Sequence, residues 1–346
     1  GIVLALMSAG GVALLFAALA MPALIHWLVR NEIGQHIRDD GPATHAAKAG
    51  TPTMGGIVLI IAAVVGYLAG HINTAVEFSK PGLLAIITIV GFGGVGLLDD
   101  ALKVRNKRNL GLNKRAKFAG QIFFGTGFAV AALTWAKTSS TLSFTRFDLP
   151  GWHLGPVLWG VVAVLIVIGA SNAVNLTDGL DGLAAGSSTQ SFAVLAIIGY
   201  WQFRHFPIYH LHAALDLALV AVAMAGAALG FLWWNAAPAR IYMGDTGSLA
   251  LGAALAVLCL TMNVMLLLVI LGGLFVIETL SVIIQVASFR LFHQRVFKMA
   301  PIHHHFELKG WPETTVIVRF WILAALLAAL GLGMFYADFL KVAKVV

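Results

Sequence analysis

Long apolar runs separated by short polar clusters occupy most of the 346-residue chain. A helix that crosses the hydrocarbon core of a bilayer needs about 20 mostly apolar residues, and about ten segments of the chain approach that length. This pattern predicts an all-α, polytopic integral membrane protein. The expected spans are residues 2–28, 54–70, 82–98, 118–136, 156–174, 188–201, 213–234, 248–262, 264–289 and 318–336.

No long soluble segment and no internal repeat interrupts these spans, so we expect residues 1–346 to form a single transmembrane domain. The composition agrees, because 60% of the residues are hydrophobic and 11% are charged, whereas soluble domains carry roughly a quarter charged residues. The first apolar run lacks the basic head and cleavage site of a signal peptide, which predicts a true span. The single cysteine, Cys259, predicts neither a disulfide within the chain nor a metal site.

Basic residues are distributed unevenly between the loops on the two sides of the membrane. Lys and Arg number 15 in one set of alternate loops and 6 in the opposite set with the C-terminal tail. Because cytoplasmic loops are enriched in Lys and Arg, the first set is predicted to be cytoplasmic and both termini to lie outside. The basic cytoplasmic loops then account for the net charge of +7, and no nucleic-acid partner is expected. The richer loops are 30–53, 99–117, 175–187, 235–247 and 290–317.

Acidic and histidine residues cluster in the same loops. One carboxylate beside a helix end is usually a cap or an interfacial residue. Five carboxylates and three consecutive histidines on one side instead favour an active site at the inner membrane surface. They are Asp99, Asp100, Asp178, Asp181, Asp245 and the run His303-His304-His305.

Asp99 and Asp100 close one predicted span, and Lys103 and Lys107 follow at four-residue intervals. If the helix continues, Asp99 and both lysines share one stripe, which suits a phosphate and its metal ion. A solvated helix with surface ion pairs explains the lysines equally well. The adjacent acids are more informative, because two like charges side by side tend to hold a proton or recruit a cation.

Residues 172–182 place Asn172, Asn175, Asp178 and Asp181 at every third position. This spacing drifts around an α-helix but aligns in a 3₁₀ turn, so an irregular helix end that faces a cleft is expected. Such amides and carboxylates could read a nucleobase or sugar and hold Mg²⁺ through oxygen ligands. A plain helix terminus is the weaker alternative, because the two asparagines would then lie in lipid.

Two further motifs accompany these acids. Asp245 lies between Gly244 and Gly247 at the start of a predicted span, where it could bind a cation or cap the helix. Three consecutive histidines cannot all face one way in a helix, so phosphate contact suits residues 303–305 better than a closed zinc site. The chain carries no Ser or Cys nucleophile elbow and no P-loop, which removes support for covalent hydrolysis and ATP hydrolysis.

Five motifs, in one order along nearly the whole chain, resemble the phospho-N-acetylmuramoyl-pentapeptide transferase family. The acidic motifs alone are similar to the wider superfamily of polyprenyl-phosphate hexose-1-phosphate transferases. The histidine run, which continues through Trp311-Pro312-Glu313, resembles the muramoyl-pentapeptide branch. The motifs occupy residues 48–56, 99–100, 172–182, 243–248 and 299–313.

The resemblance implies a magnesium-dependent enzyme of the bacterial inner (cytoplasmic) membrane, with its active site on the cytoplasmic side. It would transfer phospho-N-acetylmuramoyl-pentapeptide from its UDP-linked form to undecaprenyl phosphate, giving lipid I and UMP in peptidoglycan synthesis. A homodimer is one expected assembly. A direct displacement and a route through an Asp-linked phospho-sugar both stay open.

The resemblance also implies roles for individual residues. Asp245 would be the main Mg²⁺ ligand, and Asp99, supported by Asp100, would orient or deprotonate the lipid phosphate, although these two roles could be exchanged. The remaining residues would bind substrate. They are Lys103 and Lys107 at phosphate, Asn172, Asn175, Asp178, Asp181, Tyr242 and Lys48 at the nucleoside, Gln285, His304 and His305 at the sugar or peptide, and Asn235 elsewhere on the substrate.

Two alternatives compete with this hypothesis. A sister transferase that uses UDP-N-acetylglucosamine would share the acidic motifs. A lipid flippase or transporter would share the apolar composition, but it would keep polar groups at mid-membrane, often in paired repeats, and the sequence has no such repeat. A metal transporter built on the three histidines fits less well.

Overall fold

The computed structural model of the chain describes residues 1–31, 33–34, 50–72, 74, 76–105 and 111–343. Helices make up most of this part, and its strands are limited to the antiparallel hairpin of β1 (Thr141–Arg146) and β2 (Leu149–His153). Nine of the described helices are long and apolar enough to cross a membrane, and the shorter apolar helix α2 (Gly56–His71) accompanies them. The predicted all-α, multi-pass fold is therefore confirmed, although the hairpin was not expected.

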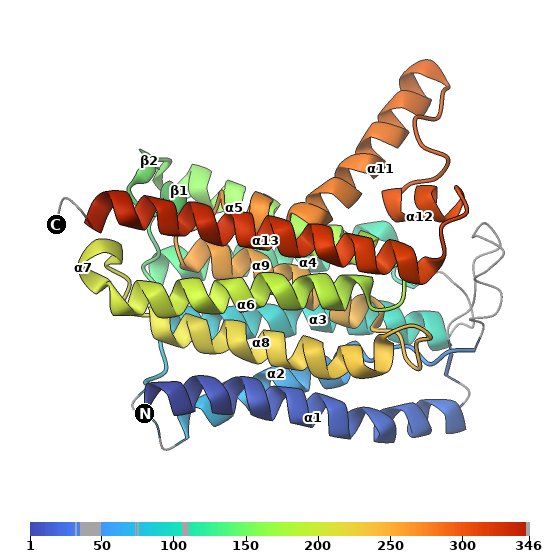
Figure 1. Cartoon of the computed structure of the whole chain (residues 1–346), viewed down its shortest axis with the longest axis horizontal. Helices are drawn as coiled ribbons and strands as arrows, with labels where there is room; N and C mark the ends of the chain where they lie inside the picture. Colours follow the sequence, from blue (N-terminus) through green and yellow to red (C-terminus); the bar gives the residue numbers. More distant parts are fainter. Residues whose placement is uncertain (32, 35–49, 73, 75, 106–110, 344–346) are drawn as a thin grey trace.

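The helices pack side by side into one bundle (Figure 1). In chain order, the other helices are α1 (Ile2–Arg30), α3 (Lys80–Arg105), α4 (Lys114–Thr134), α5 (Gly155–Thr177), α6 (Leu183–Arg204), α7 (Phe206–Tyr209), α8 (Ala214–Asn235), α9 (Gly244–Thr261), α10 (Leu268–Leu271), α11 (Gly273–Phe292), α12 (Ile302–Glu307) and α13 (Glu313–Ala343).

Each predicted span coincides with helical structure, but some boundaries differ. α6 and α9 begin several residues earlier than the apolar pattern indicates. Glycine, serine and acidic residues near these ends weaken the pattern, yet Gly186 and Thr246 are buried against neighbouring helices. The predicted span 264–289 is divided, because α10 ends at Leu271 and α11 leaves the bundle at an angle from Gly273 (Figure 1).

Both termini lie at one end of the bundle, as an even number of crossings predicts (Figure 1). α8 and α9 form the interior and are buried along most of their length. The outer helices expose large apolar side chains, including Leu19 of α1, Phe123 of α4 and Leu326 of α13. An apolar exterior around a polar helix end is the arrangement expected of a protein surrounded by lipid chains.

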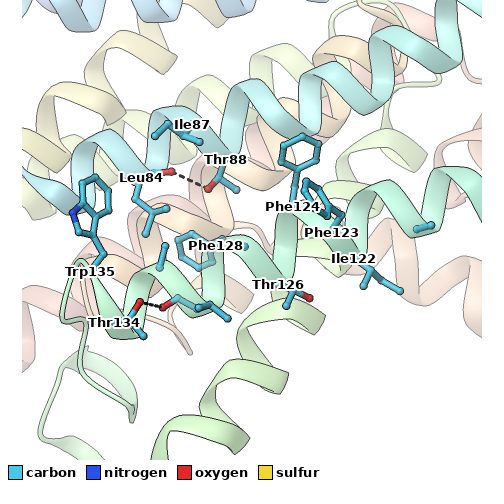
Figure 2. Close-up of a pocket in the computed structure, with 14 residues that line it drawn as sticks. Leu84, Ile87, Thr88, Ile122, Phe123, Phe124, Thr126, Phe128, Thr134 and Trp135 are labelled. Carbon is cyan, nitrogen blue, oxygen red and sulfur yellow. Dashed lines mark hydrogen bonds between the residues drawn. The ribbon is translucent and has the colours of Figure 1, made fainter.

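An apolar pocket of about 990 Å³ lies between α3 and α4 (Figure 2). Its walls include Leu84 and Ile87 of α3, Phe123 and Phe128 of α4, and Trp135 just beyond α4. Such a lining suits hydrocarbon chains rather than a charged ligand. Charged side chains of the same two helices, including Asp99 and Lys103 of α3 and Lys117 of α4, lie outside this lining.

Small residues let α3 and α9 approach closely. A Cβ atom added at Gly96 would overlap the backbone carbonyl of Asp245, at the start of α9. Gly94, on the same helix, has nothing within 4 Å of the corresponding position. Close approach through small residues is a common packing mode of membrane helices. Here it brings the acidic end of α3 against the first turn of α9.

Gly96→Ala should therefore destabilise the protein while Gly94→Ala should not. Overpacking at a close contact costs about 1–3 kcal/mol, whereas alanine in open space within a helix gains about 0.5–1 kcal/mol. Thermal unfolding of the two purified variants in one detergent measures the difference. Equal unfolding temperatures would show that the α3–α9 contact tolerates a methyl group.

Candidate active site

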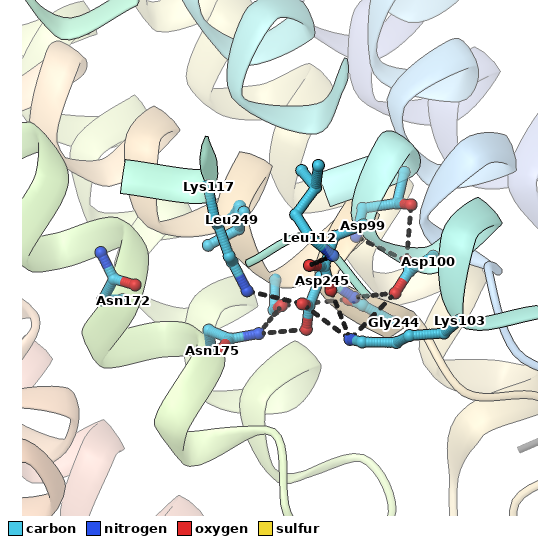
Figure 3. A network of polar contacts seen from close by, with 12 residues as sticks. Asp99, Asp100, Lys103, Leu112, Lys117, Asn172, Asn175, Gly244, Asp245 and Leu249 are labelled. Atoms are coloured by element: carbon cyan, nitrogen blue, oxygen red, sulfur yellow. Dashed lines mark hydrogen bonds and ion pairs between the residues drawn. The ribbon is translucent and has the colours of Figure 1, made fainter. Parts of the chain in front are cut away.

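Three carboxylates that are distant in sequence meet where α3 ends and α9 begins (Figure 3). Asp99 and Asp100 lie near the end of α3, and Asp245 lies in the first turn of α9. One oxygen from each comes within 4.8 Å of the others. The sequence predicted that these acids share a side of the membrane, and the fold brings them into one cluster.

Asp245 is the centre of this cluster, because three other helices direct side chains at it (Figure 3). Lys103 Nζ of α3 and Lys117 Nζ of α4 donate to Asp245 Oδ2 at 2.9 and 2.6 Å. Asn175 Nδ2 of α5 donates to Asp245 Oδ1 at 2.8 Å and to Ser248 Oγ at 2.8 Å. Both oxygens of the half-buried Asp245 are therefore held by donors, two of them cationic.

Asp100 caps α9 although it belongs to α3. Its carboxylate accepts hydrogen bonds from the backbone N–H groups of Asp245 at 3.1 Å and Thr246 at 2.9 Å, and from Thr246 Oγ1 at 2.7 Å. Gly244 has a φ of +70°, and a Cβ atom there would overlap Asp100 Oδ2. A carboxylate at a helix N-terminus satisfies unpaired N–H groups and complements the helix dipole. Asp100 thus fixes the backbone that carries Asp245.

Asp99 connects the cluster to the segment that precedes α4. Its Oδ1 accepts the backbone N–H of Leu112 at 2.9 Å, and its Oδ2 pairs with Lys103 Nζ at 2.6 Å. Lys103 also lies 3.6 Å from Asp100 Oδ1, so one ammonium group contacts all three acids. The predicted stripe of Asp99 and Lys103 at a four-residue interval is confirmed, whereas Lys107 lies outside the described residues.

The donor set of this cluster fits a divalent cation. Carboxylate oxygens are the ligands that Mg²⁺ prefers, and three of them converge here. Both oxygens of Asp100 already accept hydrogen bonds from α9. Asp99 and Asp245 instead contact lysine ammonium groups, which a divalent cation could replace, so these two acids are the better candidates for contact with a metal ion.

The predicted irregular helix end is shorter than expected. α5 stays a regular α-helix through Thr177, and the N–H of Asp178 still donates to Val174 O at 3.1 Å. The expectation of a tightened turn from residue 172 onward is therefore wrong. Asn172 turns toward Gln121 of α4, with Nδ2 donating to Oε1 at 3.0 Å, while Asn175 faces Asp245. The three-residue spacing thus directs the two amides at different neighbouring helices.

The irregular segment itself comprises residues 178–182, between α5 and α6. Asp181 Oδ2 accepts the N–H of Ala239 at 2.9 Å, and the N–H of Asp181 donates to Glu313 Oε1 at 3.1 Å. Asn235 Oδ1 accepts the N–H of Gly182 at 3.0 Å, and its Nδ2 donates to Ile241 O at 2.9 Å. Asn235 therefore supports this segment from within the protein, and a direct contact with substrate stays a prediction.

Asp178 lies in a strongly acidic environment. Burial raises its pKa to about 8, and the negative charges of Asp245, Asp100 and Asp181 add to the effect. A carboxyl group of this kind is neutral at pH 7 and can donate a hydrogen bond.

The predicted sugar and peptide residues lie on α11 and α12. Gln285 links α11 to the segment that follows it. Its amide donates to Phe297 O and accepts the N–H of Phe297, both at 2.9 Å. His304 Nδ1 lies 2.7 Å from Glu307 Oε2. His305 Nδ1 accepts the N–H of Lys298 at 3.0 Å.

His305 is biased toward its neutral form. Partial burial lowers the pKa of its imidazole, and the positive charges of Lys309 and Lys298 lower it further. Its role in substrate binding stays a prediction.

Some of the predicted site residues lie in one network, and others do not. Asp99, Asp100, Lys103, Asn175 and Asp245 form one polar network (Figure 3). Asn172 lies apart from that network in Figure 3, next to Gln121. Lys48 lies outside the described residues. Tyr242, whose backbone carbonyl accepts the N–H of Gly55 at 2.9 Å, lies two residues before the start of α9.

Sequence reasoning missed Lys117 and Gln121. Lys117 was counted only among the basic residues of a cytoplasmic loop, and Gln121 was read as part of an apolar span. Both lie on α4, one turn apart, and they face Asp245 and Asn172. A lysine and a glutamine four residues apart on one face were the available signal.

Comparison with known proteins agrees with this arrangement. The family model of Glycosyl transferase family 4 matches residues 82–263. Phospho-N-acetylmuramoyl-pentapeptide-transferase signature 1 matches residues 48–60. Proteins named phospho-N-acetylmuramoyl-pentapeptide-transferase from Frankia alni and Streptomyces griseus are each 49% identical, over 95% of this chain and 96% and 97% of their own lengths. The one from Thermobifida fusca is 48% identical over 97% of this chain and 99% of its own.

The chain belongs to the phospho-N-acetylmuramoyl-pentapeptide-transferase family. The described part of the family signature packs directly beneath the carboxylate cluster. The N–H groups of Gly55 and Gly56 donate to Tyr242 O and Met243 O, both at 2.9 Å. In this transferase the signature thus supports the turn from which α9 presents Asp245.

The raised pKa of Asp178 predicts a pH effect on stability in the absence of metal. The folded carboxyl keeps its proton up to about pH 8, whereas an unfolded aspartate loses it near 3.8. Stability gained through the neutral form is therefore present in acid and is lost as the pH rises toward 8. Thermal unfolding in EDTA at pH 5, 6.5 and 8 should show this decline in the wild type, and Asp178→Asn should reduce it. Identical profiles would mean that Asp178 ionises normally.

Proposed function

We propose that this chain transfers phospho-N-acetylmuramoyl-pentapeptide from its UDP-linked form to undecaprenyl phosphate, releasing UMP and forming lipid I, with Mg²⁺ as cofactor. The observation that carries the proposal is the cluster of Asp99, Asp100 and Asp245 at one end of a membrane helix bundle. The names of relatives at 48–50% identity over nearly the whole chain support the same activity.

We further propose that the protein lies in the bacterial inner membrane with this end facing the cytoplasm. The set of alternate loops in the sequence that includes Asp99, Asp100 and Asp245 holds 15 of the Lys and Arg residues, against 6 in the opposite set with the C-terminal tail. Cytoplasmic loops are enriched in basic residues. A soluble nucleotide substrate and a lipid phosphate would both have access to helix ends at that surface.

The reaction joins two anions. An oxygen of the lipid phosphate attacks the β-phosphorus of the UDP-linked donor, a new P–O bond forms, and the bond to UMP breaks so that UMP leaves with the electron pair. A Mg²⁺ ion held mainly by Asp245 would neutralise the diphosphate and stabilise charge on the transferring phosphoryl group. Lys103 and Lys117 supply two ammonium groups to the same place.

The surrounding residues fit the two substrates. Asp99 pairs with Lys103, whereas Asp100 is held by the N–H groups of α9. Asp99 is therefore our candidate for orienting or deprotonating the lipid phosphate. Asp178 and Asp181 would receive the nucleoside. Tyr242, two residues before α9, would contact it as well. With its raised pKa, the carboxyl group of Asp178 can donate a hydrogen bond to a carbonyl oxygen. The carboxyl group of Asp181 offers oxygens that can accept one.

The comparisons favour this function over its rivals. All the most similar relatives reported above bear the muramoyl-pentapeptide name, and none the name of an N-acetylglucosamine transferase. A transporter would place its charged groups near mid-membrane. The cluster here lies instead where α3 ends and where α9 begins.

The direct test is release of UMP by the purified protein from each of two donors. UDP-N-acetylmuramoyl-pentapeptide with undecaprenyl phosphate should release UMP when Mg²⁺ is present, and EDTA should stop the reaction. UDP-N-acetylglucosamine should be a poor donor. Turnover that needs no divalent cation, or that prefers the smaller donor, would contradict the proposal.

Asp245→Asn should lose nearly all turnover while the protein stays folded, because an amide binds Mg²⁺ poorly. A matched control is Asp338→Asn. Asp338 accepts hydrogen bonds from Thr145 at 2.6 Å and Arg146 at 3.1 Å on the far side of the bundle. Initial rates at saturating substrate should fall in the first variant only. Near-normal turnover of Asp245→Asn at ordinary Mg²⁺ would remove Asp245 from the site.

Asp99→Asn and Asp181→Asn should damage different steps. Asp99→Asn should chiefly lower kcat, since an orienting or proton-accepting carboxylate matters most in the transition state. Asp181→Asn should instead weaken nucleoside binding by about 1–3 kcal/mol, the worth of one hydrogen bond to a charged group. Calorimetric binding of a uridine-containing inhibitor, beside turnover at saturating substrate, separates the two effects.

The opposite result would reverse this assignment. If Asp99→Asn abolished inhibitor binding while Asp181→Asn left it intact, the nucleoside would bind near α3 rather than at residues 178–182.

A further inference from the structure

Glu278 of α11 and His303 of α12 face each other, and both side chains are 0% exposed. Glu278 Oε2 lies 3.1 Å from His303 Nδ1. Within the described residues, neither Glu278 oxygen and neither His303 nitrogen makes a hydrogen bond of good geometry. The mechanism proposed above uses neither residue.

A buried pair without good hydrogen bonds is not expected to stabilise the folded protein. Removing charges from water costs more than an imperfect ion pair returns, and replacing such a pair by apolar residues is often neutral or stabilising. Buried polar groups without good partners are rare in native proteins. The pair therefore needs a reason other than stability.

The position of the His303 ring supplies that reason. A Cβ atom added at Gly179 would lie 2.5 Å from His303 Nε2 and 3.1 Å from its Cε1. The imidazole thus stands between Glu278 on one side and residues 178–182 on the other. Only glycine at position 179 permits this contact.

The same contact includes the next histidine of the run. His304 Nε2 would lie 3.5 Å from the added Cβ atom at Gly179, and the His303 and His304 rings pack edge to face with centroids 4.1 Å apart. The three consecutive histidines are therefore not equivalent. His303 is wholly buried, whereas His304 and His305 are partly exposed.

We propose that Glu278 and His303 are positioning residues for the donor substrate. Glu278 orients the His303 imidazole, and that ring holds residues 178–182 and His304 in the shape that receives the UDP-linked donor, with its nucleoside at residues 178–182 and its sugar or peptide at His304. Both side chains are fully buried, so they act through their neighbours rather than by contact. This inference rests on the proposed function for the identity of the donor.

The experiment compares Glu278→Gln and Gly179→Ala with Ser281→Ala as the matched control. Ser281 is buried on the same helix, and its hydroxyl donates to the backbone carbonyl of Glu278 at 2.6 Å. The measurements are KM for the UDP-linked donor, KM for undecaprenyl phosphate, kcat, and calorimetric affinity for UMP. Glu278→Gln and Gly179→Ala should raise the donor KM and weaken UMP binding about tenfold, a usual effect of losing an orienting partner. Ser281→Ala, and the lipid KM in every variant, should stay near the wild-type values.

A double variant, Glu278→Leu with His303→Leu, separates positioning from stability. It should unfold at or above the wild-type temperature, because the poorly paired buried polar groups are gone, yet its donor KM should stay raised. Recovery of the wild-type donor KM together with stability would overturn the proposal. If this variant does not fold, the donor KM of Glu278→Gln decides, and an unchanged value overturns it.

A readout without substrate keeps the inference distinct from the proposed function. Amide hydrogen exchange at residues 178–182 should be faster in Glu278→Gln than in the wild type and in Ser281→Ala. A wild-type protein that neither turns over the donor nor binds UMP would refute the proposed function. Unchanged exchange at residues 178–182 would refute the positioning role.

Discussion

The hydrogen bonds that Asp100 accepts from the first turn of α9 hold the charged network in place. An α-helix cannot pair its first N–H groups internally, and here the partner comes from another helix, α3. The bonds therefore fix α3 and α9 relative to each other. Asp245 is thereby held where lysines from α3 and α4 and an asparagine from α5 can contact it.

The acids at the two ends of the bundle have different surroundings. At the end with the termini, Asp216 accepts hydrogen bonds from Ser79 at 2.7 Å and Tyr67 at 3.2 Å and lies 3.0 Å from His71 Nε2. That single carboxylate is enclosed by donors of the chain itself. At the other end, three carboxylates share one place, and their mutual repulsion requires cations. Lys103 and Lys117 supply positive charge there through ammonium groups that contact Asp245.

Several features of the site could be predicted from single residues and local spacing. The pairing of Asp99 with Lys103 follows from a four-residue interval on one helix. Asn172 and Asn175 were correctly expected to need polar partners, because unpaired amides are costly in a membrane. Their partners could not be named, since Gln121 and Asp245 lie on helices distant in the sequence. The irregular helix end was predicted to start at residue 172, but α5 stays regular through Thr177. Polar spacing does not reveal which neighbouring helix each amide faces, so it was mistaken for irregular backbone.

The membrane class, the approximate spans and the family could be read from the sequence alone, as could the concentration of acids and histidines in one set of loops. These properties depend on the length of apolar runs, on charge bias between loops and on short motifs, all of which are local. Only the tertiary structure decided that Asp100 caps α9, that Lys117 contacts Asp245, and that His303 is buried beside Glu278 while His304 is not. Periodicity reports which face of one helix is polar, whereas the partner of that face is set by how helices far apart in the chain pack together.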